Sequence, residues 1–517
     1  MTQSRVQNSV KNIIYGVVQK LVSVLLPFAI KSIILYKLGK QYLGLNGLFS
    51  SILQVLTLSE LGFDCAISFR LYKPVAEKDN EKIGALLNYL RKMYRIIGIV
   101  IMVAGLAVAP FLKFLIKGSH PADINLYVLF FIYLFNTLIG YFICPQYNVL
   151  LNSSQQRSAI SIINLIVNIA ATTLQIVLLL ITANYYLYII VLPLASLSIK
   201  LLSKFTAKKM FPEIVTSGKI DENEQSSIKQ NIKDIFGHKV GGVVFDAADS
   251  IVISAVLGLS MVGLYNNYYY ITTAVSGFLS AIYSAITASV GNSIISESVD
   301  KNYSDFKKLQ FINYAVVTFC CCCLLCLFQP FMGLWGKLTG EDLMLPFSMV
   351  ILFVIYFYIS RAKQMVVVYK DAAGLWYADR LKPYVGAIAN LGLNILLVHF
   401  IGLHGVLLSS IFIMAFITFP WTAAALFKGY FKKKQSPYYV EFFINLIVTI
   451  LLCVITYFVC SLIPIGGVLG LLVKLLICCV LPTSLYVLLF FKTKGFKESL
   501  TLLKKVFHSK SKKEVVS

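Results

Sequence analysis

Apolar runs of helical length follow one another along almost the whole chain, separated by short breaks rich in Lys, Gly or Asn. A helix needs about 20 apolar residues to cross the roughly 30 Å hydrocarbon core of a bilayer. The runs lack the ten-residue alternation of apolar and polar positions that is typical of outer-membrane barrel strands. The pattern therefore predicts an all-α polytopic membrane protein.

Fourteen apolar runs are candidates for transmembrane helices. In chain order they cover residues 13–36, 43–66, 96–116, 125–150, 159–182, 185–203, 236–259, 267–290, 310–333, 344–368, 383–401, 404–427, 440–461 and 467–491. An even number of spans places both termini on the same side of the membrane. Between the second and third runs, segment 70–95 mixes apolar and charged residues at near-helical spacing, and it is either a helix on the membrane surface or a solvated connector.

The longest polar interval, Lys200–Lys239, divides the chain into two similar halves. It is too short and too polar to build a core of its own, so we expect a connector and not a domain. The predicted division is 1–204 as an N-terminal lobe of six spans, 205–235 as a cytoplasmic elbow, 236–427 as a C-terminal lobe of six spans, 428–491 as two accessory spans and 492–517 as a basic tail.

Two short patterns recur in the same order in both halves. Leu38-Gly39-x3-Leu43-Gly44-Leu45 returns 219 residues later as Leu257-Gly258-x3-Val262-Gly263-Leu264, and Asn164-Leu165-x2-Asn168 returns 226 residues later as Asn390-Leu391-x2-Asn394. The offset equals six spans, an even number, so both copies cross the membrane in the same direction. This is a parallel repeat, which transporters with a site between two lobes also have.

Composition and charge add the orientation. Hydrophobic residues make up 58% of the chain and charged residues only 13%, whereas soluble domains carry about 25% charge. The net charge of +23 is concentrated in alternate connections and in the C-terminal tail, which predicts that these connections and both termini are cytoplasmic. The same placement accounts for the basic charge without nucleic-acid binding.

Other features exclude some classes of protein. Every predicted outer connection is short, unlike the sizeable outer loops of membrane polymerases and ligases, and no G-x4-G-K-[ST] nucleotide-binding loop occurs. The N-terminus shows no cleavable signal peptide. Five of the eleven cysteines lie in one run, FCCCCLLCLF, but without a His or a second pair nearby we expect no metal site.

Several charged residues lie within predicted spans, where they cost roughly 2.5–3.5 kcal/mol each unless they face a partner or water. They are Lys20 and Lys31 in span 1, Glu60 and Asp64 in span 2, Asp246 and Asp249 in span 7, and Arg361 and Lys363 near the end of span 10. Arg361 and Lys363 are two residues apart, so at most one of them faces a central cavity, and Arg361 is the better candidate. The four acidic residues either pair with residues of neighbouring helices or take part in ion coupling.

Uncharged polar residues also occur within spans. Asn136 and the repeated pairs Asn164/Asn168 and Asn390/Asn394 either face a wet interior or bond neighbouring helices. Pro27, Pro145, Pro193 and Pro420 are positions where spans are expected to bend.

The sequence resembles the Wzx-type polysaccharide flippases of the multidrug/oligosaccharidyl-lipid/polysaccharide (MOP) exporter superfamily. The resemblance is carried by GLNGLFSSILQVLTLSELGFDCAISFRLYKPVAEKDNEKI in the first half, and by GLYNNYYYI and ADRLKPYVGAIANLGLNILLVHFIGLHGV in the second. It implies two lobes that open alternately to either side of a bacterial plasma membrane. The implied cargo is an undecaprenyl-pyrophosphate-linked oligosaccharide, which moves from the inner to the outer leaflet for synthesis of a capsule, an exopolysaccharide or another surface glycan.

With this cargo, Lys20, Lys31 and Arg361 are the expected partners of the pyrophosphate, and Asn164, Asn168, Asn390 and Asn394 those of the sugar hydroxyls. Glu60, Asp64, Asp246 and Asp249 are expected to couple ions or pair helices. We expect no cofactor, with coupling to H+ or Na+ left open. Expected partners are membrane lipids and other surface-polysaccharide assembly proteins. The alternatives are a multidrug/cation antiporter or a lipid II flippase of the same superfamily and, from a different class, a membrane polymerase or ligase.

Overall fold

The computed structural model describes residues 22–60 and 63–501. Helices make up 87% of these residues, and no strand occurs within them. The predicted all-α class is therefore confirmed. The chain forms two compact units, one running to Asn266 and including Thr339–Glu341, and the other formed by Asn267–Leu338 and the chain from Asp342 onward.

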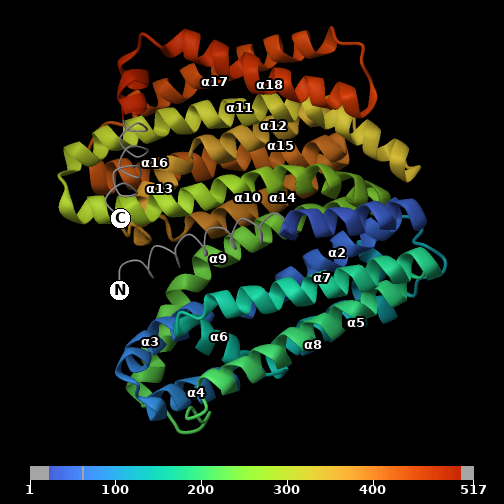
Figure 1. Ribbon diagram of the computed structural model, residues 1–517, viewed down its shortest axis with the longest axis vertical. Helices are drawn as coiled ribbons and strands as arrows, with labels where there is room; N and C mark the ends of the chain where they lie inside the picture. The colour runs from blue at the N-terminus through green and yellow to red at the C-terminus, as the bar shows by residue number, and fades with distance from the viewer. Residues whose placement is uncertain (1–21, 61–62, 502–517) are drawn as a thin grey trace, which may run out of the picture. The chain divides into compact units, whose positions relative to one another are not determined.

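Unit 1 begins with a helix over residues 22–37. Its further elements are α2 (Lys40–Leu56), the 3-10 turn η1 (Thr57–Glu60), α3 (Phe63–Glu77), α4 (Asn80–Val108), η2 (Ala109–Leu115), α5 (Leu126–Phe142), α6 (Pro145–Ser153), α7 (Arg157–Thr182), α8 (Tyr185–Met210), α9 (Glu222–Leu257) and the first residues of α10 (Leu259–Ser296). In this unit, α7 packs on α8, α8 on α5 and α5 on α4, while α2 packs on α9 (Figure 1).

Unit 2 contains the rest of α10. Its further elements are α11 (Val299–Thr339), α12 (Phe347–Ala362), α13 (Gln364–Ala372), η3 (Tyr377–Asp379), α14 (Lys382–Ile401), α15 (Leu403–Ile413), η4 (Met414–Thr418), α16 (Phe419–Leu426), η5 (Phe427–Phe431), α17 (Ser436–Ser461) and α18 (Gly467–Phe490). Helix α15 packs on α14 and α12, and α17 packs on α18 (Figure 1). The elements η4 and η5 are π-helical, so each accommodates one residue more than an α-helical turn.

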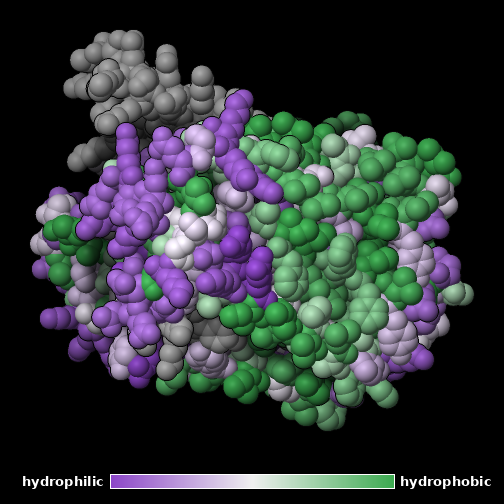
Figure 2. Space-filling view, turned by 90° about the horizontal axis from the view of Figure 1, so that it is seen from below, coloured by the Kyte–Doolittle hydropathy of each residue, from purple (hydrophilic) through white to green (hydrophobic). Residues whose placement is uncertain are grey.

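Ten of the described helices are long and apolar enough to cross a membrane, and the pair α5 and α6, bent by 54°, makes eleven. Large apolar side chains are exposed along these helices, for example on α17 at Val440, Phe443, Ile447, Ile450 and Val454. On the face drawn in Figure 2, hydrophobic residues form a broad area and hydrophilic residues gather at one end of it. Apolar exposure of this extent is typical of helices whose outer face contacts lipid.

The predicted second span, 43–66, is not one continuous helix. Helix α2 ends at Leu56, η1 follows, and α3 begins at Phe63. At the break, the Thr57 hydroxyl donates to the Gln54 carbonyl oxygen at 3.0 Å. Local hydrogen bonds of this kind compete with the helix, but Thr within an apolar run does not interrupt the sequence pattern.

Segment 70–95 is helical on both sides of a turn and is continuous with the two helices that flank it. It contains the end of α3, a tight turn at Lys78 (φ 56°) and the first turns of α4, which Asp79 caps by accepting from the Lys82 N–H at 2.9 Å. Helix α4 then continues into the apolar residues predicted as span 3. Its apolar start is buried because linker 211–221 crosses it, with the Asn88 amide donating to the Gly218 carbonyl oxygen at 2.9 Å.

Candidate functional site

The repeated Leu-Gly pattern marks two equivalent helix junctions in unit 1. Gly39 (φ 97°, ψ 175°) joins helix 22–37 to α2, and Gly258 (φ 93°, ψ 171°) joins α9 to α10. A residue with a side chain rarely adopts this conformation, which explains why both positions are glycine. The two copies therefore share local backbone geometry as well as sequence.

The helices that follow these junctions pack against each other through the next glycines of the repeat. A Cβ added at Gly44 would lie 2.0 Å from the carbonyl oxygen of Leu259, and one at Gly263 would lie 2.4 Å from the carbonyl oxygen of Lys40. Both contacts relate the same two positions of the repeat, because 40 and 259, like 44 and 263, differ by 219. Helices α2 and α10 thus make reciprocal contacts through equivalent positions of the repeat.

Two connections complete this region. The Lys117 N–H, which follows η2, donates to the Ser254 carbonyl oxygen near the second junction at 2.9 Å. At the first junction, Glu341 accepts from the Lys40 N–H at 3.3 Å and forms an ion pair with Lys40 Nζ at 3.6 Å. Lys117, from the first half of the chain, thus contacts the junction of the second half, and Glu341, from the second half, contacts the junction of the first. We call Gly39, Lys40, Gly44, Lys117, Ser254, Gly258, Leu259, Gly263 and Glu341 the junction clasp.

The predicted cationic residues lie on different elements. Lys20 lies outside the described residues, and Lys31 is half-buried on helix 22–37. Arg361, at the end of α12, lies within electrostatic reach of Tyr283 on α10. Its carbonyl oxygen accepts from the Asn313 amide at 3.1 Å, and that amide also accepts from the Tyr283 hydroxyl at 2.8 Å. Arg361 is therefore placed beside a polar pair formed by α10 and α11.

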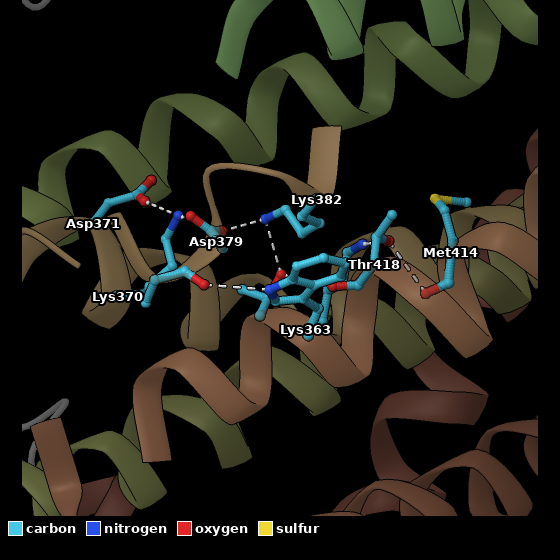
Figure 3. Close-up of polar contacts among 10 residues, drawn as sticks. Lys363, Lys370, Asp371, Asp379, Lys382, Met414 and Thr418 are labelled. Atoms are coloured by element: carbon cyan, nitrogen blue, oxygen red, sulfur yellow. Dashed lines mark hydrogen bonds and ion pairs between the residues drawn. The ribbon is translucent and has the colours of Figure 1, made fainter. Parts of the chain in front are cut away.

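Lys363 points to a different set of helices. Its Nζ donates to the Thr418 hydroxyl of η4 at 3.1 Å (Figure 3). The separation of Arg361 and Lys363 onto different partners agrees with the spacing argument from the sequence.

The predicted acidic residues are bonded to tyrosines where they are described. Asp64 accepts from the Tyr94 hydroxyl. Asp249 is buried, and its carboxylate accepts from the Tyr265 hydroxyl of α10 at 2.6 Å. The side chains of Glu60 and Asp246 lie outside the described part of the chain.

The two asparagine pairs of the repeat have different surroundings. Asn164 is half-buried and Asn168 exposed on α7, whereas Asn390 and Asn394 on α14 are fully buried. The Asn390 amide donates to the Ser410 hydroxyl of α15 at 3.1 Å. Contact of this second pair with a sugar would therefore require α14 and α15 to separate.

Unit 2 also contains a buried ionic network that sequence reasoning missed. Lys370 Nζ lies 2.9 Å from carboxylate oxygens of both Asp371 and Asp379, and Lys382 Nζ contacts Asp379 as well as the Thr422 hydroxyl, the latter at 3.0 Å. Figure 3 shows these side chains converging from α13, η3 and α14. The sequence signal is the pair Asp371 and Asp379, which lies among the lysines and arginines of the connection between the predicted spans 344–368 and 383–401.

Replacing Asp379 with Asn is expected to destabilise the protein by about 3–5 kcal/mol, because it leaves two buried lysines without their shared counter-charge. Thermal unfolding of the purified protein in detergent measures this loss. Asp305, also bonded to two lysines but with 20% of its side chain exposed, provides the control, and Asp305→Asn is expected to cost clearly less. An equal effect of the two substitutions would contradict a structural role specific to the buried network.

Comparison with known proteins shows which solved structures have a similar fold. No protein-family model matches the chain, and no curated protein matches it in sequence. A structure of the lipid II flippase MurJ in an inward closed conformation is similar with a TM-score of 0.63 and 14% identity, over 93% of this chain and 99% of that chain. An inward-facing multidrug resistance MATE family transporter of the MOP superfamily is similar with a TM-score of 0.59 and 16% identity, over 78% of this chain and 93% of that chain.

At these identities the similarity identifies the fold. It agrees with the all-helical architecture of the described residues. The chain has the fold of these two membrane proteins.

Proposed function

We propose that this protein is a flippase that moves an undecaprenyl-pyrophosphate-linked oligosaccharide from the inner to the outer leaflet of a bacterial plasma membrane. The observation that carries the proposal is the similarity to the lipid II flippase over 93% of the chain. The similarity to the drug transporter covers 78%. The proposed cargo is a lipid-linked molecule, and the first of these two proteins is named as a flippase for lipid II.

The positions of the cations support an anionic cargo. Lys31 is half-buried within an apolar helix, and Arg361 lies beside the polar pair Tyr283 and Asn313. Burying cations costs free energy that an anion such as a pyrophosphate would offset, whereas a cationic drug would not. Arg361 has in addition a planar fork of donors that suits phosphate oxygens.

The junction clasp supports an alternating-access cycle. With both termini cytoplasmic, Gly39 and Gly258 lie at the outer end of their helices, so the clasp closes the outer side. Because its contacts are short-range and involve few side chains, the clasp can open and close once in each transport cycle. Asp249, whose carboxylate accepts from the Tyr265 hydroxyl, is our candidate for coupling the cycle to H+ or Na+, together with Asp246.

The test is a gene deletion followed by complementation. Loss of the protein is expected to remove the surface glycan and to accumulate its lipid-linked precursor in the inner leaflet, and restoring the gene is expected to reverse both effects. Rescue of a strain depleted of its lipid II flippase would favour that cargo instead. Resistance to cationic toxicants with normal surface glycan would favour the antiporter. Partners among surface-polysaccharide assembly proteins are tested by co-purification from the same strain.

Reversing the charge of Lys40 or Glu341 is expected to shift the protein toward the outward-open state, because either change replaces an attraction across the clasp with a repulsion. The ion pair is partly exposed, so the effect is small, about 1 kcal/mol. Accessibility of a cysteine placed at Tyr42 to an impermeant maleimide measures it. Lys40→Glu and Glu341→Lys should each increase labelling, and the double exchange should restore it. No restoration by the exchange would contradict the pairing.

A further inference from the structure

Three helices of unit 2 bring cysteines together at one buried point. Cys326 of α11, Cys460 of α17 and Cys478 of α18 have their sulfur atoms within 4.8 Å of one another. Their exposed fractions are 3%, 3% and 0%. The sequence had shown only the run on α11, with no second set of ligands, and the accessory helices supply it.

The surroundings of this group contain further sulfur. Cys323, Leu327 and Ile477 pack against the three thiols. Cys322, one turn before Cys326 on α11, and Cys453, two turns before Cys460 on α17, have their sulfur atoms 3.6 Å apart. Within the described residues, no His, Asp or Glu joins the three sulfur atoms. The possible ligand atoms are therefore all sulfur, which is a soft donor, and apolar side chains enclose them.

The spacing fits a small metal ion. Three sulfur atoms at about 2.3 Å from a central ion lie roughly 4 Å apart in a trigonal arrangement. The observed upper limit of 4.8 Å requires each sulfur to move inward by only a few tenths of an ångström. Rotation of the Cys side chains provides such a movement without displacing the helices.

We propose that Cys326, Cys460 and Cys478 form a binding site for a soft, monovalent metal ion of low coordination number, with Cu(I) as its representative. Thiolate ligands select Cu(I), zinc and iron–sulfur clusters. Structural zinc is almost always four-coordinate, and iron–sulfur clusters are held by four cysteines, whereas Cu(I) accepts two or three sulfur atoms. A monovalent ion also requires the fewest ionised thiols to reach neutrality in apolar surroundings.

Binding has a simple proton balance and a structural consequence. Each thiol that becomes a thiolate ligand releases its proton, and no electron is transferred. The bound ion would join α11 to both accessory helices. Inside a membrane, helices lack a hydrophobic force that drives them together, so such a tie would hold α17 and α18 in place.

The experiment titrates the reduced, metal-free protein in detergent with Cu(I) under anaerobic conditions, against a coloured Cu(I) chelator. The wild type is expected to withdraw one Cu(I) per chain. Cys460→Ser and Cys478→Ser are expected to bind at least about tenfold more weakly, because an alcohol is a poor ligand for a soft ion. Cys479→Ser is the matched control, because Cys479 is adjacent to Cys478 but exposed.

Gel filtration and thermal unfolding without metal show whether each variant is folded, and Cys→Ala at the same positions serves where a serine variant is not. A Cu(I)-induced rise in melting temperature is expected in the wild type and in Cys479→Ser only. Failure of the wild type to withdraw Cu(I), or equal affinity of Cys478→Ser and Cys479→Ser, would overturn the site. Tighter binding of Zn(II) than of Cu(I) would overturn the assignment to a monovalent ion.

Discussion

Gly263→Ala is expected to abolish transport and to lower the melting temperature of the protein. The added Cβ would lie 2.4 Å from the backbone carbonyl oxygen of Lys40, and a backbone atom cannot rotate away as the end of a side chain can. Helices α2 and α10 would have to separate along the clasp. Overpacking of this kind costs about 1–3 kcal/mol, and we expect the upper end of that range. Gly44→Ala, which meets Leu259 at 2.0 Å, is expected to behave in the same way.

Surface-glycan export and thermal unfolding in detergent measure the two effects. The matched control is Gly291→Ala, which lies on the same helix α10 and whose Cβ would meet nothing within 4 Å. That change should be neutral, or stabilising by up to about 1 kcal/mol through helix propensity. Equal export and stability of Gly263→Ala and Gly291→Ala would contradict the role of close packing at the clasp.

Lys31→Ala and Arg361→Ala are each expected to reduce glycan export by about 10- to 100-fold while leaving the protein in the membrane. A hydrogen bond to a charged group contributes roughly 1.5–3 kcal/mol, and about 1.4 kcal/mol corresponds to a factor of ten. The measurements are the amount of surface glycan, the inner-leaflet pool of lipid-linked precursor, and the membrane level of each variant by immunoblot.

Two controls separate charge from geometry. Lys37 is exposed and lies on the same helix as Lys31, so Lys37→Ala should export normally. Arg361→Lys keeps the charge but loses the two-pronged donor arrangement, and it should retain part of the activity. Normal export by both Lys31→Ala and Arg361→Ala would contradict a role for these two cations in binding the cargo.

Much of the architecture was predictable because a membrane leaves few choices. Every backbone polar group must be bonded within the segment, so each long apolar run becomes a helix. The repeat was also predictable in part, because Gly39 and Gly258 are required by backbone geometry and Gly44 and Gly263 by close packing. Such requirements leave the same residue at the same spacing in both copies.

The features that the sequence did not reveal depend on contacts between distant segments or on small local energies. The break after Leu56 depends on local hydrogen bonds that apolar patterning does not record. Burial of the start of α4 depends on linker 211–221, more than 100 residues away. The Asp379 network and the three-thiol group each depend on which faces of separate helices meet. A single chain without homologous sequences gives no information on that choice.

The π-helical segment η4 limits how the length of this protein can change. It follows α15 and carries Thr418, the partner of Lys363, and α16 beyond it carries Thr422, the partner of Lys382. Because its wide turn already accommodates one extra residue, deleting one residue from Met414–Thr418 would leave an ordinary α-helical turn with Thr422 still on the side of Lys382. A second deletion would remove a residue from a regular helix and rotate everything after it by about 100°. This stretch can therefore lose one residue without a change in α16, but no more.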